Sequence, residues 1–152
     1  MNSIIFFCAT YFIYISVLYV AYYSFYKGDK KYLIRNLILV IGGATVAWVI
    51  NHFLKNIVAH PRPDLALALL LPNDPYSFPS GHASFMFALG FLMSYFNKRA
   101  GVIILILALV TGIARVLSGV HYWYDILGGA ILGYIVSYII FFFYKKYFLK
   151  NN

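Results

Sequence analysis

Residues 124–144 are YDILGGAILGYIVSYIIFFFY, an apolar run in which Asp125 is the only charged side chain. About 20 apolar residues are enough to cross roughly 30 Å of hydrocarbon as a helix. Lipid offers no hydrogen-bond partners, so the backbone of such a segment must be helical. An ionisable group at membrane depth is costly, which favours a functional role for it. This stretch therefore predicts a membrane-spanning helix with a functional group at one end.

Four further apolar runs lie near 4–26, 33–54, 80–96 and 101–118. The chain is 63% hydrophobic and 11% charged over 152 residues, which is too apolar for a soluble domain of this size. A soluble protein with a very hydrophobic core is the disfavoured alternative. No basic residues precede the first run and it has no small-residue cleavage site, so we expect a retained helix. The sequence predicts a single all-α domain over 1–152, an integral membrane bundle of about five transmembrane helices.

The connections between the runs differ in character. The turn through Asn97-Lys98-Arg99 is tight, so the third and fourth helices should form an antiparallel hairpin. Residues 56–79 contain all five prolines and form the longest irregular stretch, because proline cannot continue a helix interior. Within it, residues 65–71 are expected to form a short helix at the membrane interface. Cys8 is the only cysteine, so no intrachain disulfide is possible.

The net charge of +8 would suggest nucleic acid in a soluble protein, but membrane topology explains it better here. Nine cations fall on one face of the predicted bundle, and the positive-inside rule makes that face cytoplasmic. These nine are Lys27, Lys30, Lys31, Arg35, Lys98, Arg99, Lys145, Lys146 and Lys150. The other three, Lys55, Arg62 and Arg115, lie on the opposite face. We expect a multi-pass protein of the inner (plasma) membrane, with the N-terminus and the functional site outside and the C-terminus cytoplasmic.

One patch of polar residues combines Arg115, His121 and Asp125. The last two are four apart, so they would share a helix face. The carboxylate can accept a hydrogen bond from the imidazole Nδ1–H, which leaves Nε2 free as a nucleophile. Ser118-Gly119 offers a break between the fourth and fifth helices. A structural hydrogen bond, with Arg115 reaching to the interface, is the alternative interpretation.

A second patch, Pro79-Ser80-Gly81-His82, directly precedes the third helix. Gly81 permits close approach of the backbone, and the N–H groups of a helix N-terminus favour an anion. His82 would lie in the first turn, suited to donate a proton to a leaving oxygen. An ordinary helix start capped by Ser80 fits the same residues.

The remaining patch pairs Lys55 with Arg62, which lies between Pro61 and Pro63. A guanidinium can bind phosphate oxygens bidentately, and a lysine adds a point charge. Anchoring to lipid headgroups is the alternative. His52 is expected to pack at the interface, and His60 to be an exposed turn residue.

Taken together, the patterns Lys-x6-Arg-Pro, Pro-Ser-Gly-His and Arg-x5-His-x3-Asp occur in this order over about half the chain. This resembles the type 2 phosphatidic acid phosphatase superfamily of lipid phosphate phosphatases, and most of all its bacterial undecaprenyl-diphosphate phosphatases. The resemblance implies that His121 attacks phosphorus, that Asp125 orients it and that His82 protonates the leaving group. It assigns phosphate binding to Lys55, Arg62, Ser80, Gly81 and Arg115. It implies no metal and no cofactor.

The resemblance also implies a lipid phosphate substrate in the bilayer and no nucleic-acid partner. A polyprenyl diphosphate is the first candidate, followed by phosphatidylglycerol phosphate, phosphatidate and lipid A 1-phosphate. A lipid phosphotransferase and a non-catalytic lipid-binding or transport protein are the alternatives. The chain departs from the family pattern in two respects. Ala114 replaces the usual serine before Arg115, and one N-terminal helix is expected to be missing because two helices, not three, precede Lys55.

Overall fold

The computed structural model describes residues 2–27, 31, 33–64, 66, 68–72 and 74–149. Its described part is all-α, as predicted, with five long helical segments and no strand beyond one isolated bridge between Pro61 and Tyr76. The elements are α1 (Asn2–Tyr26), α2 (Leu33–Leu37), the π-helical η2 (Ile38–Gly42), α3 (Gly43–Val58), α4 (Gly81–Phe96), α5 (Lys98–Leu117), α6 (Trp123–Tyr144) and the π-helical η4 (Lys145–Leu149).

Four helical segments are long and apolar enough to cross a membrane: Asn2–Tyr26, Leu33–Val58, Lys98–Leu117 and Trp123–Phe148. The second of these runs through α2, η2 and α3 without a break. Helix α4 has 16 residues, which at 1.5 Å per residue is about 24 Å, less than the thickness of the hydrocarbon core. The prediction of an integral membrane helix bundle is confirmed, with α4 as its one short member among the described segments.

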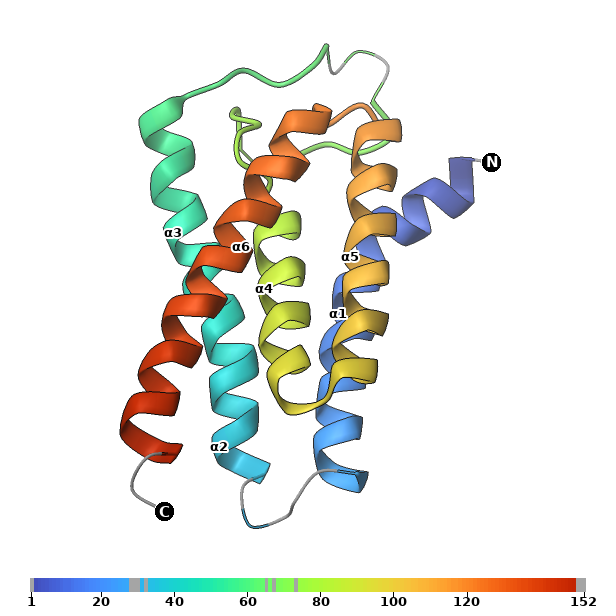
Figure 1. Ribbon diagram of the computed structural model, residues 1–152. Coiled ribbons are helices and arrows are strands. Elements are labelled where there is room, and N and C mark those ends of the chain that lie inside the picture. The colour runs from blue at the N-terminus through green and yellow to red at the C-terminus, as the bar shows by residue number, and fades with distance from the viewer. Residues whose placement is uncertain are drawn as a thin grey trace.

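Helix α4 lies in the middle of the bundle and packs against α3, α5 and α6, while α1 packs against α5 (Figure 1). Half of its 16 residues are buried. Its upper end lies below the upper ends of α3, α5 and α6 (Figure 1). The start of α4 is therefore recessed, and the ends of its three neighbours form walls around it.

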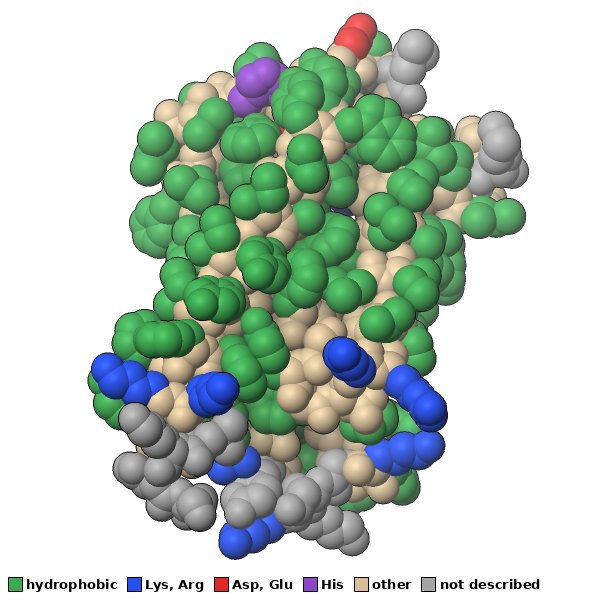
Figure 2. Space-filling model, in the orientation of Figure 1, with side chains coloured by type: hydrophobic (Ala, Val, Ile, Leu, Met, Phe, Trp, Pro, Cys, Tyr) green, Lys and Arg blue, Asp and Glu red, His purple; other side chains and the backbone are tan. Residues whose placement is uncertain are grey.

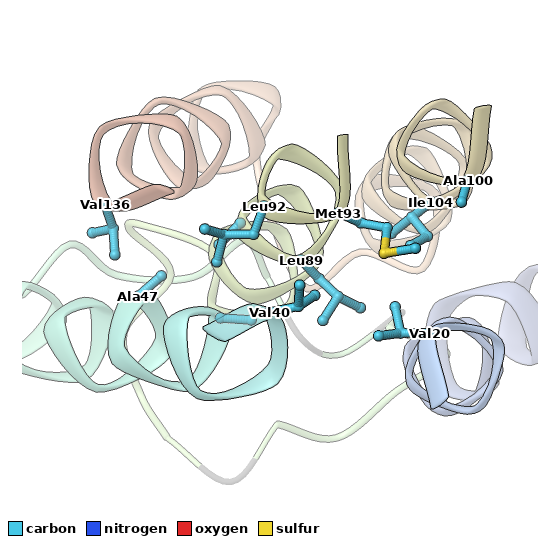
Figure 3. Close-up of a cluster of buried hydrophobic side chains, with 11 residues drawn as sticks. Val20, Val40, Ala47, Leu89, Leu92, Met93, Ala100, Ile104 and Val136 are labelled. Atoms are coloured by element: carbon cyan, nitrogen blue, oxygen red, sulfur yellow. The ribbon is translucent and has the colours of Figure 1, made fainter. Parts of the chain in front are cut away.

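The main core cluster joins all five helical segments (Figure 3). Leu89, Leu92 and Met93 of α4 form its centre, and the other helices contribute Val20, Val40, Ala47, Ala100, Ile104 and Val136. Lipid tails are as apolar as these side chains, so the association of the helices depends on close packing more than on burial from water. Small residues at the contacts are what this kind of packing needs.

Two glycines bring α6 against the backbone of α4. A Cβ atom at Gly133 would lie 2.8 Å from both the backbone N of Ala88 and the backbone O of Ser84. A Cβ atom at Gly129 would lie 2.8 Å from the backbone O of Ser80. Backbone atoms cannot turn aside as a flexible side chain can. This contact therefore fixes the position of α6 along α4, and with it the relative height of the two helix starts.

The predicted hairpin between α4 and α5 is confirmed, with Asn97 as the single residue between the helices. Its side-chain Oδ1 accepts a hydrogen bond from the backbone N–H of Ala100 at 2.9 Å and so caps α5. The short helix expected at 65–71 does not extend over 68–71, which are not helical, whereas Ala66 has a 3-10 conformation. Residues 65 and 67 lie outside the described residues.

The charged ends of the bundle differ. On the face seen in Figure 2, the Lys and Arg side chains gather at the lower end, where α1, α4 and α6 finish. Lys55, Arg62 and Arg115 lie toward the other end, as predicted, because α3 and α5 run upward. Lys30 and Lys150 of the predicted cytoplasmic set lie outside the described residues. The seven described members of that set all belong to the lower end.

We predict that Gly133→Ala lowers the free energy of unfolding, because the added methyl group meets backbone atoms of α4. Overpacking of this kind costs about 1–3 kcal/mol. Gly42→Ala is the matched control, because a Cβ atom there would meet only Ile38 Cγ2, at 4.0 Å. Both variants share the gain in helix propensity, so their difference reports the packing. Unfolding in mixed detergent micelles measures it, and equal stabilities would contradict the close contact.

Candidate active site

Four segments meet at the upper end of the bundle: the last turns of α3, the connection 59–80, the start of α4, and the junction between α5 and α6. They enclose a cavity of about 460 Å³. Its lining residues are Trp48, Asn51, His52, Lys55, Arg62, Leu71, Pro72, Asp74, Gly81, His82, Arg115 and His121. All predicted site residues except Ser80 and Asp125 line the cavity, and these two are fully buried.

His121 and Asp125 form the pair that their spacing predicted. Nδ1 of His121 lies 3.1 Å from Oδ2 of Asp125. A carboxylate can only accept, so Nδ1 carries the proton and Nε2 presents its lone pair. Asp125 also accepts from the backbone N–H of Tyr122 at 2.8 Å and from the Ser77 hydroxyl at 3.4 Å. The expectation of a shared helix face is wrong in detail, because His121 precedes α6 and is not helical.

The surroundings of His121 keep its imidazole neutral. Burial lowers its pKa to about 4, and the nearby Arg115 and Arg62 charges act in the same direction against the Asp125 hydrogen bond, which raises it. The ring is only 2% exposed. Nη1 of Arg62 lies 3.5 Å from Nε2. At neutral pH His121 therefore presents an uncharged Nε2 beside a guanidinium.

Backbone carbonyl groups hold Arg62 in place. Its Nη1 donates to the backbone O of Val120 at 2.7 Å, and its Nε donates to the backbone O of Asp74 at 2.9 Å. The Arg62 side chain is 3% exposed. Lys55 is also buried and lies in the last turn of α3. Two cations from different segments thus converge on one side of the cavity.

Asp74 lines the cavity, although the sequence analysis did not assign it to the site. Its Oδ1 lies 3.1 Å from Nζ of Lys55 and 2.9 Å from Nη2 of Arg62. Burial would raise the pKa of this carboxyl group, but Lys55 and Arg62 outweigh that effect and lower it.

The only available signal for Asp74 in the sequence was that Asp74 and Asp64 are the acidic residues of the long irregular stretch. Asn51, Trp48 and His52 were also not assigned to the site.

Hydrogen bonds hold the start of α4 on two sides. The backbone N–H of Ser80 donates to the backbone O of Asp125 at 3.0 Å. From α3, the Asn51 amide donates to the backbone O of Pro79 at 3.0 Å and to the Ser84 hydroxyl at 2.9 Å. Ser80 occupies the N-cap position, but its side chain makes no capping hydrogen bond. Its buried Oγ has no hydrogen-bond partner among the described residues, so capping does not account for this serine.

The predicted break after Arg115 is confirmed. Helix α5 ends at Leu117, and Gly119 has a φ of 76°, a left-handed conformation that glycine adopts without strain. Arg115 lines the cavity instead of reaching into lipid. Its buried Nε has no hydrogen-bond partner among the described residues. No hydrogen bond within the described residues therefore occupies Nε of Arg115, and this side chain lines the cavity.

The other histidines and aromatic residues lie around this centre. His60 is 3.1 Å from the Ser77 hydroxyl and 3.3 Å from the Tyr124 hydroxyl, and it does not line the cavity. His52 stacks on Trp48, with ring centroids 6.3 Å apart, at the α3 wall of the cavity. Trp123 is exposed on the outside of the bundle, as anchoring in the interface requires.

The sequence profile of the PAP2 superfamily matches residues 32–149. This chain belongs to the PAP2 superfamily. A bacitracin transport permease protein BcrC of Bacillus licheniformis is 32% identical over 149 residues, covering 93% of this chain and 70% of the relative. An undecaprenyl-diphosphatase BcrC of Bacillus subtilis (strain 168) is 32% identical over 96 residues, covering 61% of this chain and half of the relative. The expectation of a membrane lipid phosphate phosphatase is confirmed at the level of the family.

Two solved structures share the fold. A transmembrane PAP2 type phosphatidylglycerolphosphate phosphatase from Bacillus subtilis superposes with a TM-score of 0.67 at 25% identity, covering 97% of this chain and 76% of that chain. LpxE of Aquifex aeolicus has a TM-score of 0.71 at 23% identity, covering 93% of this chain and 87% of that chain. The arrangement of helices around the cavity is therefore that of PAP2 membrane phosphatases.

We predict that His121 titrates with a pKa near 4, well below the ordinary value of about 6.5. Asp125→Asn should lower the pKa further, because it removes the negative charge that favours the imidazolium. Nitrogen NMR of the histidine rings in detergent micelles measures both values. A wild-type titration near 6.5 would contradict the burial of the ring.

Proposed function

We propose that this chain hydrolyses a lipid phosphate through a phosphohistidine intermediate, with its site on the extracytoplasmic side of the membrane. The observation that supports it most is the geometry of His121. Its Nδ1 is tied to the buried Asp125 and its neutral Nε2 lies in a cavity that Lys55, Arg62 and Arg115 line. A nucleophile, the group that orients it and cations for developing negative charge are the parts that phosphoryl transfer requires.

The phosphoryl group would lie between the cations of α3, the 59–80 connection and α5. Arg62 and Arg115 can each bind two of its oxygens, and Lys55 contributes a point charge. Ser80 and the Gly81 backbone, at the start of α4, add donors from a helix N-terminus. Three fixed cations supply the charge stabilisation that a metal supplies in other phosphatases, so we propose a metal-independent reaction.

The reaction has two steps. First, Nε2 of His121 attacks phosphorus, the N–P bond forms and the P–O bond to the leaving group breaks. His82 enters this step as an imidazolium, gives one proton to the leaving oxygen and becomes neutral. Asp125 stabilises the positive charge that the His121 ring acquires. Water then attacks phosphorus, the N–P bond breaks, and the proton of the water returns to His82. Both histidines regain their starting states as phosphate leaves.

The location of the site favours a lipid substrate. The cavity is built from helix ends, beside a surface rich in exposed large apolar side chains. Basic residues collect at the opposite end of the bundle, and the positive-inside rule places that end in the cytoplasm. We therefore propose a plasma (inner) membrane protein whose site faces outward and whose C-terminus is cytoplasmic.

Among lipid phosphates, a polyprenyl diphosphate such as undecaprenyl diphosphate is the first candidate. The undecaprenyl-diphosphatase BcrC of Bacillus subtilis supports this choice at 32% identity. Phosphatidylglycerol phosphate is the second candidate, because a phosphatidylglycerophosphatase B of the same organism is 31% identical over 103 residues. Phosphatidate and lipid A 1-phosphate complete the panel that should be assayed with the purified protein.

We predict that His121→Ala lowers phosphate release from the best substrate by at least about a thousandfold, because it closes the covalent route. Brief incubation of the wild type with substrate labelled in the terminal phosphate should trap an acid-labile label on the protein, and the variant should trap none. Wild-type activity should persist in EDTA. A correctly folded variant with undiminished turnover would exclude the proposed nucleophile.

The orientation can be tested with single cysteines in a Cys8→Ser background. Asp64 lies in the connection above the site and Lys98 at the opposite end, and both side chains are exposed. We expect Asp64→Cys to react with a membrane-impermeant maleimide in intact cells, and Lys98→Cys to react only after permeabilisation. The opposite result would place the site in the cytoplasm while leaving the proposed chemistry untouched.

A further inference from the structure

Asp74 places a carboxylate between the two cations that are proposed to bind phosphate. One oxygen contacts both Lys55 and Arg62, at 3.1 and 2.9 Å, and the other lies 3.2 Å from Lys55. These are the positions where two phosphoryl oxygens would be expected, given the same two donors. The described contacts of Asp74 do not include a hydrogen bond to Arg115 or to the start of α4.

The backbone and the side chain of Asp74 hold Arg62 separately. The backbone O accepts from Nε of Arg62 at 2.9 Å, and the carboxylate accepts from Nη2. Rotation about χ1 would remove the carboxylate and leave the backbone contact in place. The aim of the guanidinium therefore does not depend on the side chain of Asp74.

The burial of the three partners is unequal. The Lys55 side chain is 9% exposed and that of Arg62 3%, whereas that of Asp74 is 42% exposed. A buried cation without a counter-ion is strongly destabilising, so Lys55 and Arg62 need an anion whenever no substrate is bound. The Asp74 carboxylate lies at the open side of the cavity, so it can rotate into water and become fully hydrated there. The geometry is that of a replaceable counter-ion.

A membrane site meets many unwanted anions. Ordinary phospholipids are phosphodiesters with one negative charge and two free phosphoryl oxygens, and they surround the bundle. A lipid monophosphate or diphosphate ends in a phosphoryl group with three free oxygens and up to two charges. Without a counter-ion, Lys55 and Arg62 would attract both kinds of headgroup.

We propose that Asp74 is a specificity-determining residue, a built-in competing anion that excludes phosphodiester headgroups and yields to a terminal phosphoryl group. A phosphodiester could only replace the two oxygens that Asp74 already supplies. A terminal phosphoryl group replaces them and keeps a third oxygen for Arg115 and for the donors at Ser80 and Gly81. This inference rests on the proposed function, because it takes the cavity to be a phosphate site.

The expected effect follows from the populations of the two states. If the carboxylate occupies the site in about nine-tenths of the molecules, the apparent affinity for any competing anion is about a tenth of its intrinsic value. Removing the carboxylate should then tighten binding of inorganic phosphate by about tenfold. The same factor applies to a phosphodiester, so its weaker intrinsic binding should lie below the measurable range in the wild type and rise into that range once the carboxylate is removed.

The test measures binding by titration calorimetry in a phosphate-free detergent, and so does not depend on turnover. The probes are inorganic phosphate and dimethyl phosphate, a soluble phosphodiester with one charge. The variant is Asp74→Asn, which keeps the backbone contact to Arg62. Asp74→Ser is a second neutral variant in case the first does not fold, and Asp74→Glu retains the charge.

Asp64→Asn is the matched control for net charge. Asp64 belongs to the same connection and is exposed. Within the described residues its carboxylate accepts from the backbone N–H of Ala66, at 3.0 Å. The Asp64→Asn variant should bind both probes as the wild type does. The neutral Asp74 variants should bind phosphate about tenfold more tightly and should show measurable binding of dimethyl phosphate. Lys55→Met should abolish phosphate binding in either background.

Two results would overturn the inference, and they differ from failure of the proposed function. Unchanged or weaker phosphate binding by the neutral Asp74 variants would make Asp74 a support for the cations. Tighter phosphate binding without any dimethyl phosphate binding would remove the role in specificity. If instead neither the wild type nor the neutral variants bind phosphate, the cavity is not a phosphate site, and both proposals fail together.

Discussion

Positive charge buried at the end of an apolar bundle is the constraint on which the rest of this structure depends. Lys55 and Arg62 are almost fully enclosed, and isolated charges in such surroundings are too costly to persist without partners. Asp74 and a set of backbone carbonyl groups supply those partners. The cations are thus held at fixed positions before any ligand arrives, and preorganised charge of this kind is what stabilises a phosphoryl-transfer transition state.

The length of α4 sets the depth at which these charges operate. Its 16 residues leave its start below the ends of α3, α5 and α6, and the close contacts at Gly129 and Gly133 prevent it from sliding along α6. The Ser80–Asp125 backbone hydrogen bond joins the same two helices at their upper ends. A packing feature deep in the bundle therefore determines where His82 and His121 lie relative to each other.

Much of this could be predicted from the sequence, because each inference rested on a local signal. Apolar run lengths gave five helical segments to within a few residues, and Ser118-Gly119 marked the end of α5. The polar patches that contain His82, His121 and the three cations were identifiable because charges are so rare in the surrounding runs. The prediction that His121 shares a helix face with Asp125 was wrong, because a spacing of four residues does not require both residues to be helical. Instead, His121 lies just before α6 and contacts Asp125 in the first turn of that helix.

The contacts of Asp74 could not be predicted from the sequence, for a physical reason. Its partners are 19 and 12 residues away, across an irregular stretch whose path no periodic pattern specifies. An acidic residue in a proline-rich connection is indistinguishable from a solvated loop residue until the fold places it. Asp64 shows the contrast, because the same kind of side chain in the same connection accepts a hydrogen bond from the local backbone N–H of Ala66. Composition therefore locates the cations of such a site, whereas the three-dimensional path of the connection decides which anion neutralises them.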